Sequence, residues 1–203
     1  MKIICIGLNY RKHALEMGRP FPDEPVVFLK PDSSLLKNNK PFFLPDFSTC
    51  VHYEAEVVVR ISRLGKSIEP QYAARYYDAL TIGIDITARD LQTRFSRERL
   101  PWELSKCFDG AAPVGRYITA GSVSDINNLD FRLEINGAIV QKASTSDMIF
   151  SIHQIISFVS RFFTLKTGDL IFTGTPSGVG ELHRNDRLVG WIEDTPLLDF
   201  MIR

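Results

Sequence analysis

Hydrophobic positions recur along this chain at two different spacings. Over residues 151–163 they recur every three or four positions, which predicts an amphipathic helix whose apolar side lies in the core: Ile152, Ile155, Ile156, Val159, Phe162 and Phe163. Over residues 130–141, apolar and polar residues alternate on both sides of Asn136 and Gly137. This pattern predicts a two-residue β-hairpin, because a type I′ turn requires a positive φ at both central positions.

Shorter apolar runs predict the remaining elements. We expect strands over residues 2–6, 26–29, 54–61, 80–86, 113–118 and 169–172, with two short strands at the end of the chain. Helices are expected over residues 10–17, 70–79 and 88–99. Because strands outnumber helices and do not alternate regularly with them, the fold class predicted is a strand-rich, mixed α+β fold and not a doubly wound sheet. No linker divides the chain, so residues 1–203 are expected to form a single domain.

Composition narrows the range of partners. The chain has 203 residues, and its 24 Lys and Arg balance its 24 Asp and Glu, so charge gives no reason to expect binding to nucleic acid or to a membrane. Cys5, Cys50 and Cys107 are an odd number without CxxC spacing, which disfavours both a disulfide framework and a zinc site. No apolar run approaches the roughly 20 residues of a membrane-spanning helix. We therefore expect a cytoplasmic protein.

Three carboxylates are candidates for a shared metal site. Glu54 and Glu56 are two residues apart in a predicted strand, so their side chains point to the same face. Asp85 lies inside a second apolar strand, where a buried carboxylate needs a partner. Adjacent carboxylates repel each other, and carboxylate oxygens suit Mg²⁺ or Mn²⁺. We hypothesise that Glu54, Glu56 and Asp85 share one such ion. In the alternative interpretation, the glutamates form the solvated face of an edge strand and Asp85 caps a turn.

Two further segments contain candidate proton-transfer and anion-binding groups. His13 and Glu16 are three residues apart in a predicted helix, so they are neighbours on its surface. A carboxylate beside an imidazole fixes its tautomer, which suits a general base for water; an exposed surface pair fits the spacing equally well. Lys106 lies among small and apolar residues, where a lysine can stabilise an oxyanion. The alternative is a lysine that extends along the surface to reach water.

A glycine-rich segment over residues 172–180 follows a predicted strand. It lacks both the Gly-Lys-Ser/Thr of a P-loop and the Gly-x-Gly-x-x-Gly spacing of a dinucleotide site. Its glycines would let the backbone and the Thr175 hydroxyl approach a small ligand closely. A tight turn without a ligand is the alternative.

Taken together and in order, these segments resemble the fumarylacetoacetate hydrolase superfamily, and within it the small single-domain branch of acylpyruvate hydrolases and oxaloacetate decarboxylases. The matching segments cover the chain to about residue 180 and are Gly7-Leu8-Asn9-Tyr10 with His13 and Glu16, Phe28-Leu29-Lys30-Pro31, Glu54-Ala55-Glu56, residues 85–92, Lys106, Asn136-Gly137, residues 146–150 and residues 173–180.

This resemblance implies a mixed β-sandwich roll and a homodimer. It implies Mg²⁺ or Mn²⁺ as the cofactor, held by Glu54, Glu56 and Asp85. It also implies that His13 and Glu16 form a water-activating dyad on a lid. The residues that would line a keto-acid pocket are Arg89, Gln92, Lys106 and Thr175. The chain departs from the family pattern at residues 193–198, where a glycine-rich closing strand is usual, and this leaves the pocket rim and the substrate choice open.

The leading functional hypothesis is hydrolysis of a carbon–carbon bond in a 2,4-diketo acid, of the acylpyruvate or fumarylpyruvate type, with release of pyruvate. His13, steadied by Glu16, would take a proton from water, and Lys106 or Gln92 would stabilise the oxyanion. Decarboxylation of oxaloacetate and isomerisation of an unsaturated keto acid are alternatives on the same site. A different class is a non-catalytic, metal-stabilised protein that binds a small acid; the intact His13, Glu16 and Lys106 argue against it.

Overall fold

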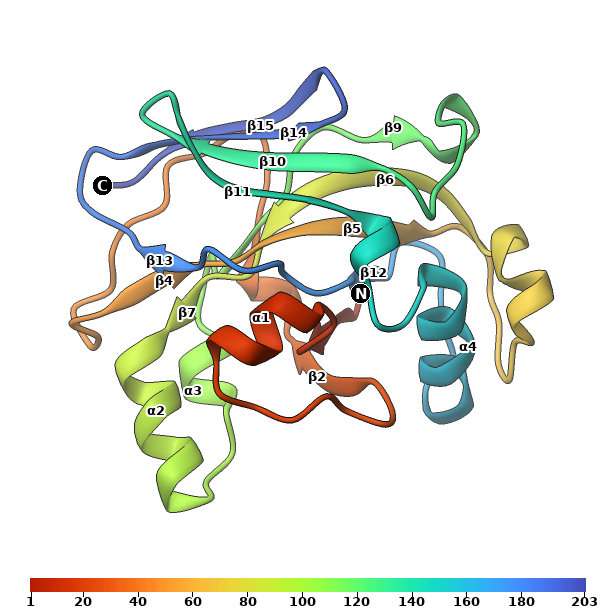
Figure 1. Ribbon diagram of the computed structural model, residues 1–203, viewed down its shortest axis with the longest axis horizontal. Coiled ribbons are helices and arrows are strands. Elements are labelled where there is room, and N and C mark those ends of the chain that lie inside the picture. The colour runs from red at the N-terminus through yellow and green to blue at the C-terminus, as the bar shows by residue number, and fades with distance from the viewer.

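The computed structural model describes all 203 residues and is built mainly from strands (Figure 1). A six-stranded sheet forms its centre, in the order β2 (Val26–Lys30), β1 (Ile3–Gly7), β12 (Leu170–Phe172), β5 (Ala55–Ile61), β6 (Tyr77–Ile84) and β9 (Ile118–Thr119). A four-stranded sheet packs on it, in the order β11 (Ala138–Ser144), β10 (Asp130–Ile135), β14 (Arg187–Ile192) and β15 (Thr195–Met201). The strand-rich α+β fold predicted from the sequence is confirmed.

Smaller elements complete the fold. A three-stranded sheet contains β13 (Gly180–Glu181), β4 (Val51–Tyr53) and β7 (Thr87–Ala88), and β3 (Leu35–Leu36) pairs with β8 (Ala112–Pro113). The α-helices are α1 (Arg11–Glu16), α2 (Arg89–Glu98), α3 (Glu103–Lys106) and α4 (Ile152–Phe162). Single 3-10 turns occupy Asp32–Ser34, Ala120–Ser122 and Thr145–Asp147.

The alternation of side chains along β5 separates two environments. Val57 packs with the core between the two large sheets, and Val59 packs with the core under α4, so these valines share one face of the central sheet. Glu56 and Val58 point to the opposite face, where Val58 joins a smaller apolar cluster with Phe172. Along β5, one side is therefore apolar, while the other also carries a carboxylate.

The strongest local patterns predicted their elements correctly. Asn136 and Gly137 both have positive φ, of 52° and 83°, and connect β10 to β11 as a two-residue turn. Helix α4 occupies the predicted segment, and the side chain of Ser151 caps it by accepting a hydrogen bond from the Gln154 N–H. The placement of Phe162 in the core was wrong, because this last residue of the helix is 58% exposed.

Three other expectations need correction. The helix expected over residues 70–79 is only a 3-10 segment, Pro70–Arg75, because the chain enters β6 at Tyr77. The strand expected over residues 113–118 is two separate two-residue strands, β8 and β9. Asp85 does not lie inside a strand: β6 ends at Ile84, one residue earlier.

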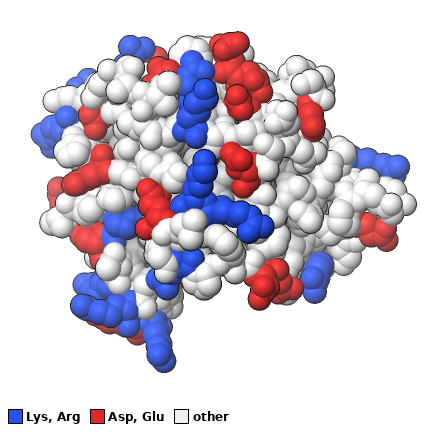
Figure 2. Space-filling view, viewed as in Figure 1, with Lys and Arg blue, Asp and Glu red and all other residues white.

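Charged side chains of both signs are interspersed on the face shown in Figure 2. None of the helices is long and apolar enough to cross a membrane.

Candidate active site

Strand pairing brings the three predicted carboxylates together. Glu54 lies between β4 and β5, Glu56 lies in β5, and Asp85 directly follows β6. Because β5 and β6 pair in antiparallel register, and the Asp85 N–H donates to the Glu54 carbonyl (2.8 Å), residues 31 positions apart become neighbours. One carboxylate oxygen from each residue lies within 4.8 Å of the other two, and all three side chains are buried. A solvated edge is therefore the wrong interpretation of Glu54 and Glu56.

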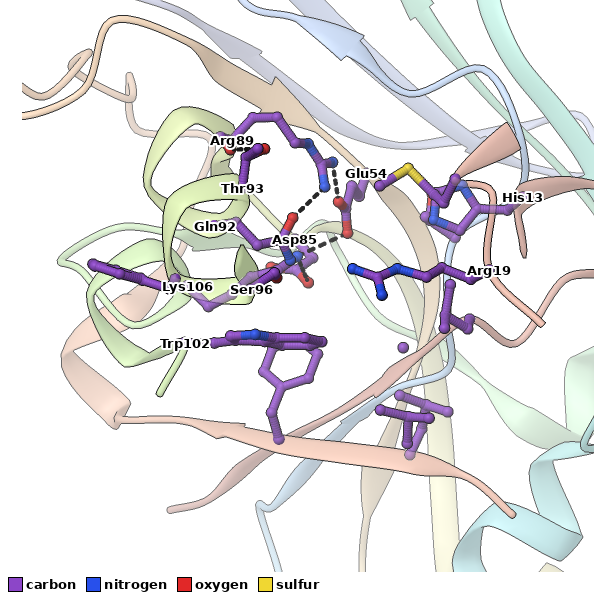
Figure 3. Close-up of a pocket in the computed structure, with 18 of the residues that line it drawn as sticks. His13, Arg19, Glu54, Asp85, Arg89, Gln92, Thr93, Ser96, Trp102 and Lys106 are labelled. Atoms are coloured by element: carbon purple, nitrogen blue, oxygen red, sulfur yellow. Dashed lines mark hydrogen bonds and ion pairs between the residues drawn. The ribbon is translucent and has the colours of Figure 1, made fainter. Parts of the chain in front are cut away.

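Basic side chains surround these carboxylates (Figure 3). The Lys106 ammonium donates to Glu54 Oε2 (2.9 Å), to Asp85 Oδ2 (2.7 Å) and to the Thr87 hydroxyl. The Arg89 guanidinium bonds to Glu54 and also to Gln92. Lys106 is 2% exposed, so the interpretation of this residue as a surface lysine is wrong.

Lys30 is a further buried cation that sequence reasoning left without a role. Its ammonium lies 2.7 Å from Asp85 Oδ1 and donates to the backbone carbonyl of Ala111 (2.9 Å). The sequence did contain an indication that Lys30 is buried, because this residue ends an apolar strand and precedes a proline. Its partner, 55 residues away, could not be read from that signal.

Burial and neighbouring charges shift the pKa values of the two glutamates in opposite directions. Burial by itself raises the pKa of Glu54, but Lys106 and Arg89 outweigh burial and hold that pKa well below its ordinary value. Burial raises the pKa of Glu56 well above its ordinary value, and the neighbouring Asp85 and Glu54 carboxylates raise it further. Burial lowers the pKa of Lys106, yet Asp85 and Glu54 more than offset this, so the ammonium stays charged. Glu56 is the one of the three carboxylates without a basic side chain as an ion-pair partner.

The donor set fits a hard divalent cation. Asp85 Oδ1 is buried and accepts no hydrogen bond, although the Lys30 ammonium lies beside it. Glu56 accepts its one hydrogen bond at Oε2, from the Gly174 N–H, which leaves Oε1 free. Carboxylate oxygens that converge with open lone pairs are the ligands preferred by Mg²⁺ and Mn²⁺.

The predicted His13–Glu16 contact is present. In α1, His13 Nδ1 lies 3.1 Å from Glu16 Oε2, and His13 is 5% exposed. The second oxygen of Glu16 accepts a hydrogen bond from the Gly178 N–H (3.1 Å), a contact that the sequence did not reveal. Glu16 therefore connects the imidazole to the glycine-rich segment, and the alternative of a solvated surface pair is wrong.

Residues 173–180, which we call the glycine loop, also contact the candidate metal site. The Gly174 N–H donates to Glu56 Oε2 at 2.6 Å. Gly174 has a φ of 106°, and a Cβ there would lie 2.6 Å from Asn9 Cβ, so no other residue fits without movement. The interpretation of this segment as a simple tight turn is therefore wrong.

A cavity of about 980 Å³ opens in front of these groups. Figure 3 shows Arg19, from the segment after α1, extending its guanidinium into this cavity. The cavity wall contains every residue proposed from the sequence except Glu16: His13, Glu54, Glu56, Asp85, Arg89, Gln92, Lys106 and Thr175. The divergent residues 193–198 do not line it; they form the turn between β14 and β15 and the start of β15, so they do not shape the rim.

Comparison with known proteins identifies the family of this chain. The family described as fumarylacetoacetate (FAA) hydrolase, C-terminal, matches residues 2–199. The chain belongs to this family. It is similar to the mitochondrial oxaloacetate tautomerase of Bos taurus, with 36% identity over 200 residues that cover 98% of this chain and 90% of that protein. It is also similar to the mitochondrial oxaloacetate decarboxylase of Dictyostelium discoideum, with 40% identity over 180 residues, 88% of this chain and 83% of that protein.

A solved structure gives the same fold. Fumarylpyruvate hydrolase from Pseudomonas aeruginosa, in complex with Mn²⁺ and pyruvate, matches with a TM-score of 0.94 and 34% identity, covering 100% of this chain and 89% of that one. These relatives differ in reaction, and each is named for a small keto acid.

Proposed function

We propose that this chain is a Mg²⁺- or Mn²⁺-dependent enzyme that moves a proton on a small 2-keto dicarboxylic acid, with oxaloacetate as the first substrate to test. The observation that carries the proposal is the charge of the cavity wall. Five basic side chains outnumber three carboxylates there, and a divalent ion would add two more positive charges; the basic residues are Arg19, Arg89, Arg97, Arg99 and Lys106. Such a wall favours a ligand with two negative charges over a neutral or singly charged one.

Glu54, Glu56 and Asp85 would hold the ion. When bound, it would act as a Lewis acid that stabilises negative charge on the keto oxygen of the substrate. The Lys106 ammonium, whose three protons go to Glu54, Asp85 and Thr87, would stabilise the same developing charge through its positive charge. Arg89 and Gln92 are placed on the cavity wall to orient a substrate carboxylate.

His13 would transfer the proton. Glu16 accepts from the imidazole, which fixes its tautomer and stabilises the imidazolium formed when His13 takes a proton from the carbon next to the keto group. The imidazolium can then deliver the proton to the enolate oxygen, which gives the enol and completes tautomerisation. Burial of His13 keeps bulk water from competing.

Hydrolysis of a 2,4-diketo acid, the leading hypothesis from the sequence, is the second candidate. The His13–Glu16 contact favours it, because the same base could take its proton from water. The similarity of this chain to fumarylpyruvate hydrolase supports hydrolysis, whereas its similarity to relatives named for oxaloacetate supports proton transfer on oxaloacetate. A homodimer and a cytoplasmic location stay predictions.

One substrate panel tests both candidates. We would measure the loss of enol-oxaloacetate absorbance, and pyruvate release from oxaloacetate and from acylpyruvates, with Mg²⁺ and with a chelator. Replacement of His13 by Ala should slow tautomerisation or hydrolysis by about 10²–10⁴-fold, while decarboxylation, which needs no proton taken by a base, should persist. The matched control is H183A, because His183 also has an acidic neighbour three residues on, Asp186, but is exposed. Equal activity with and without chelator would contradict the proposal.

A further inference from the structure

Gln141, on β11, is a buried amide that joins three separate segments of the chain. It is 1% exposed. Its Oε1 accepts from the Ala55 N–H, between the two metal-site glutamates (2.9 Å), and its Nε2 donates to the Thr175 hydroxyl oxygen (2.9 Å) and to the Pro176 carbonyl (3.0 Å). The four-stranded sheet thereby contacts both the carboxylate strand and the glycine loop through one side chain.

These contacts determine which way the amide points. A backbone N–H only donates and a carbonyl oxygen only accepts, so Ala55 requires the amide oxygen and Pro176 requires the amide nitrogen. The reverse orientation would place donor against donor and acceptor against acceptor in a buried position. Nε2 must therefore face Thr175.

The state of the Thr175 hydroxyl follows from this. Its oxygen accepts from Gln141, and no acceptor in the protein takes its proton. Thr175 is 3% exposed and lies on the cavity wall, so the hydroxyl can donate only to a ligand in the cavity. The bond from Gln141 occupies one lone pair of the hydroxyl oxygen and turns the proton away from Gln141, so that the proton is free for a ligand.

We infer that Gln141 is a positioning residue that fixes the Thr175 hydroxyl as a donor to an anionic oxygen of the substrate, either a carboxylate or an enolate oxygen. The inference rests on the proposed function for its substrate class. It assigns a role in ligand selection to a residue that touches no ligand. Removal of the donating nitrogen of Gln141 should therefore weaken binding through Thr175, whereas the amide oxygen serves the separate contact with the Ala55 N–H.

The test is a double-mutant cycle with Mg²⁺ and oxalate, an acceptor-only dianion, followed by calorimetry. T175V removes the hydroxyl with little change of shape, and Q141E replaces the donating nitrogen by an acceptor. We expect each change to weaken oxalate binding about tenfold, and the double variant T175V/Q141E to bind no more weakly than the weaker single variant. With substrate, KM should rise while kcat changes less, because the bond is present before and during reaction.

Two controls separate this role from charge and from folding. Q141M removes the donor without adding charge, and it also removes the acceptor of the Ala55 N–H, so its loss should be at least that seen in Q141E. It also serves if Q141E fails to fold, which thermal melting would reveal. Q154E makes the same substitution at an exposed position on α4 and should bind oxalate as the unmodified chain does.

The outcomes distinguish this inference from the proposed function. Unmodified affinity in both Q141E and Q141M, or losses that multiply to about a hundredfold in the double variant, would overturn the role of Gln141 alone. If the unmodified chain bound no oxalate with Mg²⁺ present, the proposed function and the inference would both fall.

Discussion

Two turns of this protein both depend on glycine and differ in what they do. The turn at Asn136 and Gly137 connects two strands, and a Cβ at Gly137 would meet nothing within 4 Å. The glycine loop donates backbone N–H groups to Glu56 and to Glu16, and Cβ atoms at Gly174 and Gly178 would both collide with neighbours. The first turn needs glycine only for its backbone angle, whereas the second also needs the space and the amide.

The difference shows that a glycine pattern reveals conformation but not purpose. The hairpin turn connects two strands, β10 and β11, that pair directly with each other. The glycine loop makes its contacts with residues 118 and 162 positions earlier in the chain. Removing its glycines should consequently damage chemistry, and removing Gly137 should damage only stability.

The largest effect is expected from G174A. A Cβ would lie 2.6 Å from Asn9 Cβ at a φ of 106°, so the loop must move and the hydrogen bond to Glu56 is lost. We expect a loss of about 3 kcal/mol in stability and of about 100-fold in Mg²⁺ affinity. Calorimetry with Mg²⁺ and thermal melting measure the two losses. Unchanged Mg²⁺ affinity in a folded G174A protein would separate the loop from the metal site.

The next effect is expected from E56Q, which alters the other partner of that hydrogen bond. Mg²⁺ binding should fall about 100-fold, because one of the three proposed carboxylate ligands is gone. Without metal, however, E56Q should melt at a higher temperature at neutral pH, since a buried carboxylate that repels Asp85 and Glu54 is replaced by a neutral amide.

The pH dependence of that stability gives an independent check on Glu56. Its pKa is raised in the folded chain, so the folded state binds more protons than the unfolded state above about 4.5. The metal-free protein should therefore lose stability as pH rises from about 4.5 to the raised pKa of Glu56, and E56Q should lack that loss. A metal-free E56Q protein that melts below the unmodified chain at pH 7 would contradict the assignment.

A smaller effect, confined to catalysis, is expected from G178A. The Gly178 N–H holds Glu16, and a Cβ would lie 2.6 Å from the Val140 carbonyl at a φ of 95°. Displacement of the loop frees Glu16, so the orientation of His13 is lost and the rate should fall about 10- to 100-fold. Mg²⁺ affinity should stay within about twofold, in contrast to G174A, because Gly178 does not contact Glu56. Steady-state kinetics at saturating Mg²⁺ measures the rate, and an equal loss of metal affinity would show that the loop acts as one unit.

The smallest effect is expected from G137A, the matched control for both loop variants. Gly137 has a φ of 83° with open space around it, so alanine is strained but not blocked. We expect a loss of about 1 kcal/mol in stability, with kcat and Mg²⁺ affinity unchanged. Any change in kcat beyond about twofold would remove the distinction between the two turns.

Local signals in the sequence account for the parts of this protein that were predicted correctly. The hairpin and α4 follow from spacing alone, because their contacts begin within a few residues. The contact between His13 and Glu16 follows from three-residue spacing in a helix. The grouping of Glu54, Glu56 and Asp85 was inferred from the chemical need of each carboxylate for a partner, and strand pairing supplies the proximity.

What could not be predicted depends on contacts between distant segments. The ion pair between Lys30 and Asp85 could not be predicted, because the register of other strands places Asp85. The sequence showed Lys30 only as part of a family motif. Gln141 gave no signal, because alternation in β11 indicates which residues face inward but not which groups they meet. Helical spacing over 70–79 misled for the same reason: pairing of β6 begins at Tyr77 and takes that segment into the sheet.

The parallel pairing of β1 with β12 places Ile3 beside Leu170 at the centre of the main sheet. A ribosome would release the acidic cluster long before it released the strand and loop that complete its surroundings. Before β12 is synthesised, the three carboxylates lack the strand that pairs with both β1 and β5. The central sheet can therefore form completely only after residue 172 has been added to the chain. We expect the proposed affinity for Mg²⁺ to arise late and in a single step, and shortened chains that stop before β12 to bind no Mg²⁺.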